Sequence, residues 1–289
     1  MPAARIALLV AGAHKAGTTT LYRWLVQHPG LAGHAQPELA FFVDEREWAE
    51  GEEAYRCYGP PAPLTRPFVA KHAKFLHAPA APERLRAHSP DARLVVLLRH
   101  PVERAHSAFG YARARGREEL STFEEALAAE EARLAAGLPP WHDAAYATSS
   151  SYLPALERLE RAFPRERVRI LLSEDLSARG PELVRELYRE LGVDAGFTPE
   201  LARRHNPGRS ARSPALARVL ERSRASAARR LVPRALRWRL AERLHAWNRA
   251  DAAPPPLAPA TRARLLERFA GSVDALERRL GRDLSAWRR

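Results

Sequence analysis

The segment that most constrains this chain is a short apolar run that leads into a loop between two glycines. Residues 6–11 predict a buried strand, and residues 12–17 form a glycine-bracketed loop before the helix predicted over 17–28. Such a loop turns backbone N–H groups toward one point, and the helix N-terminus adds about half a positive charge there. The loop and the helix start also carry one cationic and three hydroxyl side chains, on Lys15, Thr18, Thr19 and Thr20. The segment therefore predicts a binding site for a phosphate-like anion.

The loop departs from the nucleotide-binding pattern that ends in Gly-Lys-[Ser/Thr]. Here Thr18 follows Gly17, and Lys15 lies two residues before that glycine. Lys15 is thus expected to approach the anion from the loop and not from the helix. A P-loop kinase remains an alternative function, but the missing lysine after the glycine argues against it.

A second apolar strand ends in a cation where a nucleotide hydrolase would carry an acid. Residues 93–98 predict a central parallel strand, and Arg99 follows it directly. An NTPase would normally place an aspartate there to hold Mg²⁺. Pro101 suits the first turn of a helix, which puts Ser107 about two turns into it. An arginine at this place favours a second anionic group, so the ligand is predicted to have two phosphate-like ends and no metal site is required.

At these two motifs the chain resembles the sulfotransferases that use 3′-phosphoadenosine 5′-phosphosulfate (PAPS). The run Lys15-Ala16-Gly17-Thr18-Thr19, continued by Thr20, resembles their 5′-phosphosulfate loop. The pattern Arg99-x-Pro-x-x-Arg104-x-x-Ser107 resembles their 3′-phosphate motif, and residues 280–287 are similar to the end of the carbohydrate (heparan-type) and bacterial branch. The resemblance runs from Ile6 to about Trp287 and is weakest over 210–255. It implies PAPS as the donor, bound by the lysine, glycine and threonines of the loop and by Arg99 and Ser107.

The periodicity predicts an α/β chain. Strands are expected at 5–11, 31–35, 67–71, 93–98 and 167–172, and helices at 17–28, 101–114, 122–136, 150–163, 180–191 and 260–280. This alternation predicts a P-loop-like three-layer fold, with a central parallel sheet and helices on both faces. We expect a single domain over 1–289 with a basic helical insert at about 210–255.

The candidate general base is Glu38. It precedes the aromatic pair Phe41 and Phe42, and a partly desolvated carboxylate is suited to proton abstraction. In the resembling branch a glutamate just before an aromatic pair removes the proton of the acceptor hydroxyl, and Glu38 corresponds to it. His72 is the rival, because cytosolic sulfotransferases use a histidine near the end of this strand. A helix-capping role for Glu38 is a third possibility.

Weaker candidates lie in three further segments of the chain. Lys71 ends a predicted strand, which places it at the sheet edge with His72, although a solvated turn is the alternative. Arg209 and Arg212 lie in a basic turn that could close over the donor's phosphates or could be an ordinary polar loop. Residues 149–152 are expected to cap a helix by their serine hydroxyls, and a role at the donor site is a further hypothesis for Tyr152.

The composition limits where in the cell the protein is expected and what it is expected to bind. The net charge is +13 with a pI near 10.8, yet only three of the 47 basic residues are lysines. The arginines are interleaved with glutamates along helices, which argues against specific nucleic-acid binding and favours steering of anionic ligands. Cys57 is the single cysteine, and no apolar stretch is long enough to span a membrane. We expect a cytoplasmic, bacterial protein.

The sequence thus predicts a PAPS-dependent sulfotransferase acting on a hydroxyl. Lys15 would neutralise charge on the bridging oxygen, Glu38 would take the acceptor's proton, and Arg99 would hold the 3′-phosphate. A basic nucleotide- or nucleic-acid-binding protein is the non-enzymatic alternative. The acceptor's identity stays open between a carbohydrate, a lipid and a small natural product, and the acceptor could be anionic; the oligomeric state is also open.

Overall fold

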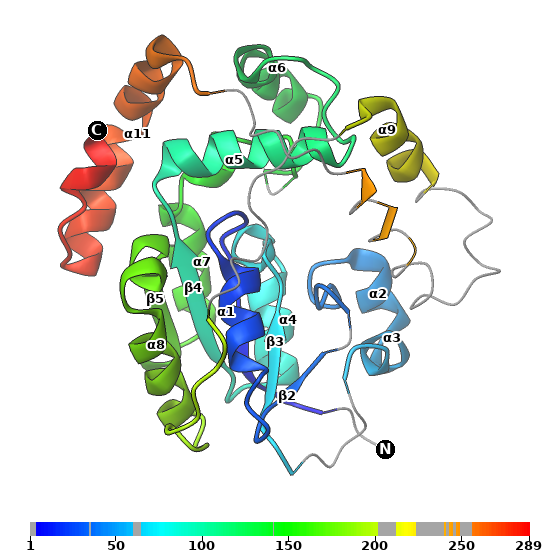
Figure 1. The fold of residues 1–289 in the computed structure, drawn as a ribbon, viewed down its shortest axis with the longest axis vertical. Coiled ribbons are helices and arrows are strands. Elements are labelled where there is room, and N and C mark those ends of the chain that lie inside the picture. The colour runs from blue at the N-terminus through cyan, green and yellow to red at the C-terminus, as the bar shows by residue number, and fades with distance from the viewer. Residues whose placement is uncertain are drawn as a thin grey trace. The chain divides into compact units, whose positions relative to one another are not determined.

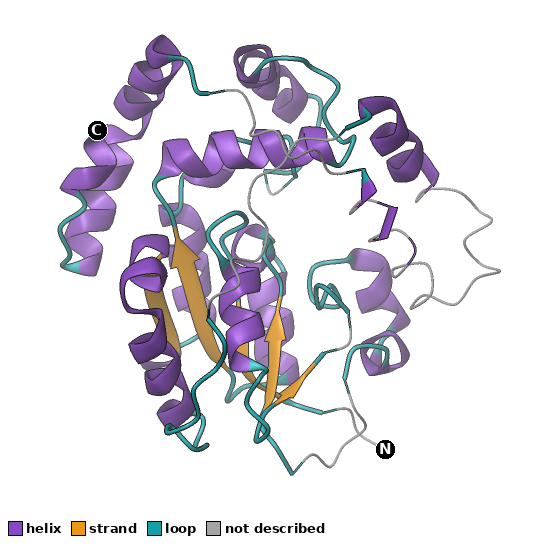
Figure 2. Ribbon diagram, in the orientation of Figure 1, coloured by secondary structure: helices purple, strands orange, loops and turns teal. Residues whose placement is uncertain are grey.

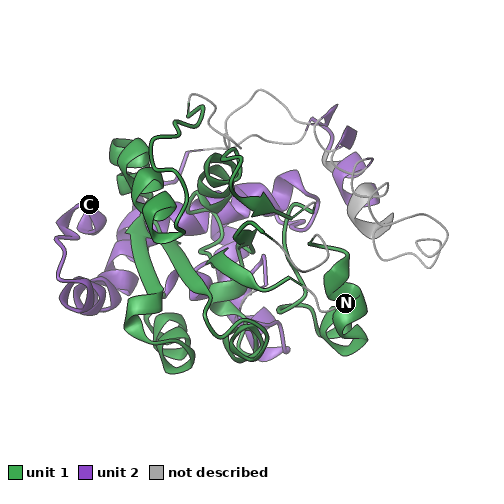
Figure 3. Ribbon diagram, turned by 90° about the horizontal axis from the view of Figure 1, so that it is seen from below, with its two compact units in different colours: residues 1–99, 152–205 green, residues 100–151, 206–289 purple. Residues whose placement is uncertain are grey.

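The computed structural model describes residues 4–34, 36–59, 65–140, 142–201, 212–223, 240, 243–244, 247–248 and 256–289. The chain divides into two compact units, which Figure 3 shows in two colours. The first comprises residues 1–99 and 152–205, and the second comprises residues 100–151 and 206–289. The predicted insert at 210–255 lies largely outside the described residues.

The first unit is built on a five-stranded sheet in which every paired strand is parallel. The strands are β1 (Ile6–Val10), β2 (Ala32–Gly33), β3 (Phe68–Lys71), β4 (Arg93–Leu98) and β5 (Val168–Leu172) (Figures 1 and 2). Their order is β2-β3-β1-β4-β5. Because β1 lies between β3 and β4, the residues that follow these three strands meet at one edge of the sheet.

Burial explains why these runs become central strands. Leu8, Leu9 and Val10 of β1 are fully buried, as are Val69 and Ala70 of β3. Strands covered on both faces are expected to be continuously apolar, in contrast to the alternating pattern of a half-exposed sheet.

Helices cover both faces of this sheet, which confirms the predicted three-layer arrangement. Figure 1 shows α1 (Thr18–Leu25) and α8 (Ser173–Glu190) in front of the sheet, and α4 (Ala81–His88) and α7 (Leu153–Ala162) behind it. Two short helices, α2 (Glu45–Glu50) and α3 (Glu52–Arg56), lie between β2 and β3 in the chain. The 3₁₀ turns are η1 (Phe75–His77) and η3 (Arg165–Arg167).

The described part of the second unit is helical. It contains α5 (Pro101–Ala114), α6 (Phe123–Ala135), α9 (Pro214–Ser223) and α11 (Pro259–Leu280), with 3₁₀ turns η2 (Thr148–Ser150) and η5 (Ser285–Arg288). Thr122 and Glu125 form a capping box at the start of α6.

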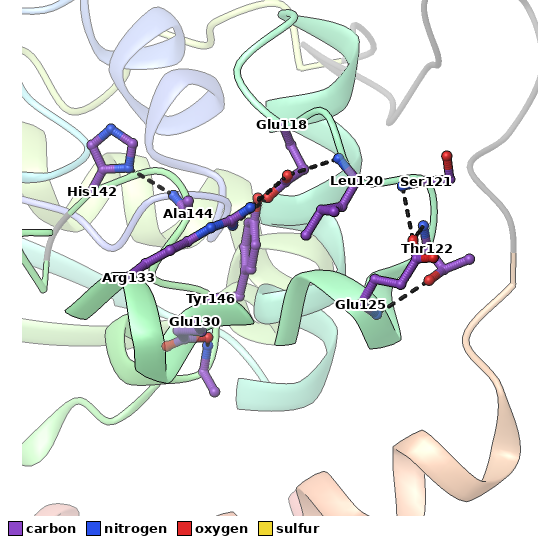
Figure 4. Close-up of polar contacts among 11 residues, drawn as sticks. Glu118, Leu120, Ser121, Thr122, Glu125, Glu130, Arg133, His142, Ala144 and Tyr146 are labelled. Carbon is purple, nitrogen blue, oxygen red and sulfur yellow. Dashed lines mark hydrogen bonds and ion pairs between the residues drawn. The ribbon is translucent and has the colours of Figure 1, made fainter. Parts of the chain in front are cut away.

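A buried polar cluster ties the loops of the second unit to α6 (Figure 4). The Glu118 side chain is 1 % exposed and accepts two hydrogen bonds from Arg133, at 2.6 and 2.9 Å, and one from the Tyr146 hydroxyl at 2.8 Å. Burial alone would raise the pKa of Glu118, but these bonds and the Leu120 N–H lower it below its ordinary value. Glu130 accepts the N–H groups just ahead of and within η2. The cluster is fully paired, so it is a structural element.

One sequence prediction about a helix start is wrong, and another covers only part of a longer helix. The serines of 149–152 do not cap a helix, because Ser149 donates to the Pro140 carbonyl and Ser150 donates to the Tyr146 carbonyl. α7 begins at Leu153, with no side-chain cap. α8 is interrupted at Arg179, whose backbone is not helical (φ −137°, ψ 36°), so the helix predicted from 180 corresponds to its second part. An additional first part begins at Ser173, where the Asp175 carboxylate accepts the Leu172 N–H at 2.9 Å.

Candidate functional site

The glycine-bracketed loop is fixed to the sheet on both sides of β1. The Ala13 N–H donates to the Leu97 carbonyl at 2.6 Å, and the Leu97 N–H donates to the Gly12 carbonyl at 2.7 Å. On the other side the Leu76 N–H donates to the Ala11 carbonyl at 2.8 Å. The loop is therefore held as a continuation of the strand, with its backbone in a defined position.

The loop backbone has the left-handed geometry of an anion-binding turn. Lys15 has φ of 72° and Gly17 has φ of 101°. A Cβ added to Gly17 would lie 3.1 Å from the Leu176 side chain, so both conformation and space favour glycine there. Gly17 is the N-cap of α1 and has no side chain to accept the first N–H groups of the helix, which leaves those donors suited to an anion at the helix N-terminus. Ala16 and Thr18 are buried beside it.

A lysine, a carboxylate and a threonine meet at the edge where β3 ends. Lys71 Nζ lies 2.5 Å from Glu38 Oε1 and 3.3 Å from Thr19 Oγ1. The Lys71 side chain is 3 % exposed, whereas that of Glu38 is 31 % exposed. The structure thus joins the predicted anion loop to the candidate base through one buried cation, and a solvated turn at Lys71 is wrong.

The Glu38 carboxylate is held by two donors. Its second oxygen accepts the Ala73 N–H at 2.9 Å, while the first accepts Lys71. The helix-capping alternative for Glu38 is wrong, because Asp44 caps α2. Phe41 and Phe42, which follow in the chain, are buried and pack with Tyr55. A carboxylate with two fixed donors and partial exposure remains able to accept a further proton from a ligand.

His34 is a supporting residue that the sequence analysis missed. Its Nε2 accepts the Lys71 N–H at 3.1 Å, and its ring stacks on Tyr22 with centroids 4.6 Å apart. The Tyr22 hydroxyl accepts the His34 N–H and donates to the His34 carbonyl. Burial, with a smaller effect of the nearby Lys71 charge, lowers the pKa of His34 to about 4. The ring is therefore neutral and orients the backbone that carries Lys71.

Arg99 follows β4 and is half-buried, and its guanidinium donates to the Lys15 carbonyl at 3.3 Å. The Tyr152 hydroxyl donates to the Arg99 carbonyl at 2.7 Å. Tyr152 therefore contacts the backbone of Arg99, and the arginine contacts the loop that carries Lys15. This link brings Arg99, the first residue of the second motif, to the loop of the first motif within the first unit.

His72 and Lys74 continue the chain beyond β3. The His72 N–H donates to the Val10 carbonyl at 3.1 Å, and its side chain is buried. Lys74 precedes η1 and is half-buried. These contacts of His72 do not decide between Glu38 and His72 as the base, so that choice stays a prediction.

The remaining candidates lie in the second unit. Ser107 is on α5, where Arg104 of the same motif is 2 % exposed and donates to the Ser150 hydroxyl at 2.7 Å and to the Tyr146 carbonyl. Arg104 is thus a structural residue. Arg212 is exposed, with its N–H on the Asn248 carbonyl at 2.7 Å, and Arg209 lies outside the described residues.

Two kinds of feature are absent from the described part of the chain. No cluster of three or more His, Cys, Asp or Glu side chains there is arranged to hold a metal ion. No helix in those same ranges has the length and apolar character needed to cross a bilayer.

Comparison with known proteins finds sulfotransferases among the proteins similar to this chain. No protein-family model matches the chain. Two relatives from Homo sapiens are each 32% identical to this chain. They are bifunctional heparan sulfate N-deacetylase/N-sulfotransferase 3, over 111 residues, and bifunctional heparan sulfate N-deacetylase/N-sulfotransferase 1, over 113 residues. These matches cover 36% and 37% of this chain but only 13% of each relative's length. The crystal structure of a sulfotransferase from Alicyclobacillus acidocaldarius superposes with a TM-score of 0.72 and 26% identity, over 99% of both chains.

Proposed function

We propose that the chain is a sulfotransferase and that it transfers a sulfuryl group from PAPS to an acceptor hydroxyl, as its similarity to known sulfotransferases supports. The S–O bond to the donor's 5′-phosphate breaks and an S–O bond to the acceptor oxygen forms. The acceptor's proton passes to a protein base, and 3′,5′-adenosine bisphosphate leaves. Positioning and charge stabilisation supply most of the catalysis, as in phosphoryl transfer.

The observation that carries this proposal is the chain of contacts from Thr19 through Lys71 to Glu38. It joins the anion loop to a carboxylate within one sheet edge, at 3.3 and 2.5 Å. A donor bound on the loop would therefore place its reacting end beside the carboxylate. This is the arrangement that in-line transfer needs, with the nucleophile's proton acceptor next to the group being transferred.

Each residue of this edge has a proposed role. Lys15 and the backbone of Ala16 and Gly17 bind the phosphosulfate end, with hydroxyls from Thr18, Thr19 and Thr20. Lys71 orients Glu38 and adds positive charge near the bridging oxygen.

Recognition of the other end of the donor is proposed for Arg99. Its contact with the Lys15 carbonyl places a guanidinium beside the loop, and a guanidinium suits a phosphate dianion. The contributions expected of Ser107, Arg209 and Arg212 stay predictions. Arg99 in place of an acidic residue also argues against a metal-dependent P-loop kinase.

The base is proposed to be Glu38, with His72 as the alternative. Glu38 has its partners in place, since Lys71 and the Ala73 N–H fix both of its oxygens. A carboxylate held in this way is positioned before the acceptor binds, which supports the assignment.

The acceptor is proposed to carry a hydroxyl, on a carbohydrate, a lipid or a small natural product. The relatives named above are N-sulfotransferases by name, so an amine acceptor is the competing chemistry. A cytoplasmic location and a bacterial source are likewise proposed, from the single cysteine and the arginine-rich composition.

Two measurements test the proposal. 3′,5′-adenosine bisphosphate should raise the melting temperature far more than AMP or ATP with Mg²⁺, and equal shifts would refute the donor assignment. Radiolabelled PAPS should then label a hydroxyl acceptor in a panel of matched alcohols and amines, with Glu38→Gln as the inactive control. Labelling of amines alone would refute the hydroxyl assignment and keep the donor assignment.

A further inference from the structure

The turn at residues 72–78, directly after β3, contacts both parts of the candidate site. Its Ala73 N–H donates to the Glu38 carboxylate at 2.9 Å. On its other side, a Cβ added to Gly12 would lie 3.0 Å from the Ala73 carbonyl oxygen and 3.0 Å from the Leu76 Cβ, so the turn packs closely against the anion loop. A shift of this turn would therefore move a support of the candidate base.

Arg158 of α7 holds the end of this turn. Its Nη2 donates to the Leu76 carbonyl and to the His77 carbonyl, at 3.2 Å each. Both carbonyls belong to η1, and the last carbonyls of a helix have no partner within the helix. A cationic donor is favourable there, because hydrogen bonds from an ionised group are stronger than those between neutral groups. Arg158 thus fixes the C-terminal end of η1 from a helix far along the chain.

An ion pair does not account for the cation at this place. Arg158 is half-buried, and burial, with a smaller effect of the Arg161 charge, lowers the pKa of Arg158 below its ordinary value. Within the part of the chain that the structure describes, no carboxylate pairs with its guanidinium, and its Nε is buried without a hydrogen-bond partner. Holding an arginine in this way costs stability, so the benefit of the side chain lies in the two carbonyls that it binds.

We propose that Arg158 is a positioning residue for the transfer reaction, because through η1 it fixes the Ala73 N–H that holds Glu38. The inference rests on the proposed function, in which Glu38 is the base. If the turn shifts, Glu38 keeps Lys71 as a donor, but its carboxylate is no longer held by both oxygens. The anion loop keeps its two hydrogen bonds to Leu97 of β4. Loss of Arg158 should therefore lower turnover more than donor affinity.

The test compares Arg158→Met with Arg161→Met, the same change at an exposed arginine three residues further along α7. Three quantities are measured: hydrogen exchange of the backbone amides of 73–78, kcat with PAPS and an acceptor that supports turnover, and the Kd of 3′,5′-adenosine bisphosphate. Arg158→Met should speed this exchange about tenfold or more and lower kcat about 10- to 100-fold, while the Kd changes less than about threefold. Arg161→Met should match the wild type in all three.

Two further variants complete the test. Arg158→Lys is the rescue variant, because its ammonium can donate to both carbonyls. It should recover most of the kcat that Arg158→Met loses and should restore slow exchange at 73–78. Arg158→Gln has a shorter side chain whose amide reaches the carbonyls less well. It should show the same separation of kcat from Kd, and it replaces Arg158→Met if that protein lacks a cooperative melting transition.

Four results would overturn the proposal. The first is unchanged exchange at 73–78 in Arg158→Met, and the second is an unchanged kcat although exchange is faster. The third is a loss of kcat and of donor affinity by the same factor, which would make Arg158 structural. The fourth is an equal loss of kcat in Arg161→Met. If the wild-type protein transfers no sulfuryl group, the proposed function fails, and the exchange measurement alone then decides whether Arg158 fixes the turn.

Discussion

Removing the charge of Glu38 should have two separable effects, one on stability and one on catalysis. Lys71 is 3 % exposed and its ammonium depends on the Glu38 carboxylate 2.5 Å away. In Glu38→Gln the amide oxygen can accept either Lys71 or the Ala73 N–H, but the amide NH₂ group then faces the other donor. The change therefore leaves one buried donor without an acceptor.

The expected magnitudes follow from burial. Removing one partner of a buried ion pair costs about 3–5 kcal/mol. Since Glu38 is 31 % exposed and an amide oxygen remains, we expect about 2–3 kcal/mol for Glu38→Gln. Lys71→Met leaves a carboxylate that water can reach, so about 1–2 kcal/mol is expected. The double change leaves no uncompensated charge, and it should cost about 1–3 kcal/mol less than the sum of the two.

The assay is urea unfolding of four proteins: the wild type, Glu38→Gln, Lys71→Met and the double variant. Turnover of the same proteins is then measured with PAPS and an acceptor that supports the reaction. The free energies of unfolding should show the coupling, and Glu38→Gln should lower kcat by ~10²–10⁴ with donor affinity preserved. Additive stabilities would refute the pairing. A normal kcat for Glu38→Gln would refute its role as the base even if the coupling is found.

Three other outcomes are expected. Arg99→Ala should weaken binding of 3′,5′-adenosine bisphosphate by about 1.5–3 kcal/mol while AMP affinity hardly changes, and equal losses by calorimetry would make Arg99 structural. Lys15→Ala should lose turnover and donor affinity, whereas His72→Asn should be mild; abolished turnover in His72→Asn alone would make His72 the base. Because burial lowers the pKa of His34 to about 4, the unfolded chain takes up a proton near pH 6.5 that the folded protein resists. Stability should therefore fall by on the order of 3 kcal/mol between about pH 6.5 and 4 in urea titrations, and the His34→Gln protein should lack that part of the slope; an unchanged slope would contradict the assignment.

The parts of the fold that depend on local pattern could be predicted from the sequence. β4 and α5 have the predicted bounds, because a continuous apolar run and a proline at the helix start are local signals. β2 was predicted over 31–35 and has two residues, since it pairs with β3 only at Ala32 and Gly33. Its length depends on the neighbouring strand and not on its own composition.

The supporting contacts of the site could not be predicted in the same way. His34 matters because β2 lies beside β3 and because Tyr22 of α1 stacks on its ring, which are contacts between residues far apart in the chain. Arg104 fits a ligand-binding pattern, yet it is buried and donates to Ser150 and Tyr146. A pattern of residue types cannot tell an arginine that contacts a ligand from one that supports a loop.

The hydrogen bond from Tyr152 to the Arg99 carbonyl has a practical consequence for dissecting the protein. The chain leaves the first unit after Arg99 and re-enters it at Tyr152, and these two points are neighbours because the hydrogen bond between the two residues is 2.7 Å long. Cutting the chain after Arg99 would remove β5 and expose the paired edge of β4, which invites aggregation. Replacing residues 100–151 by a short glycine-rich linker would instead keep all five strands on one polypeptide. Such a shortened protein would allow the loop at Lys15 to be titrated with simple phosphate compounds on its own.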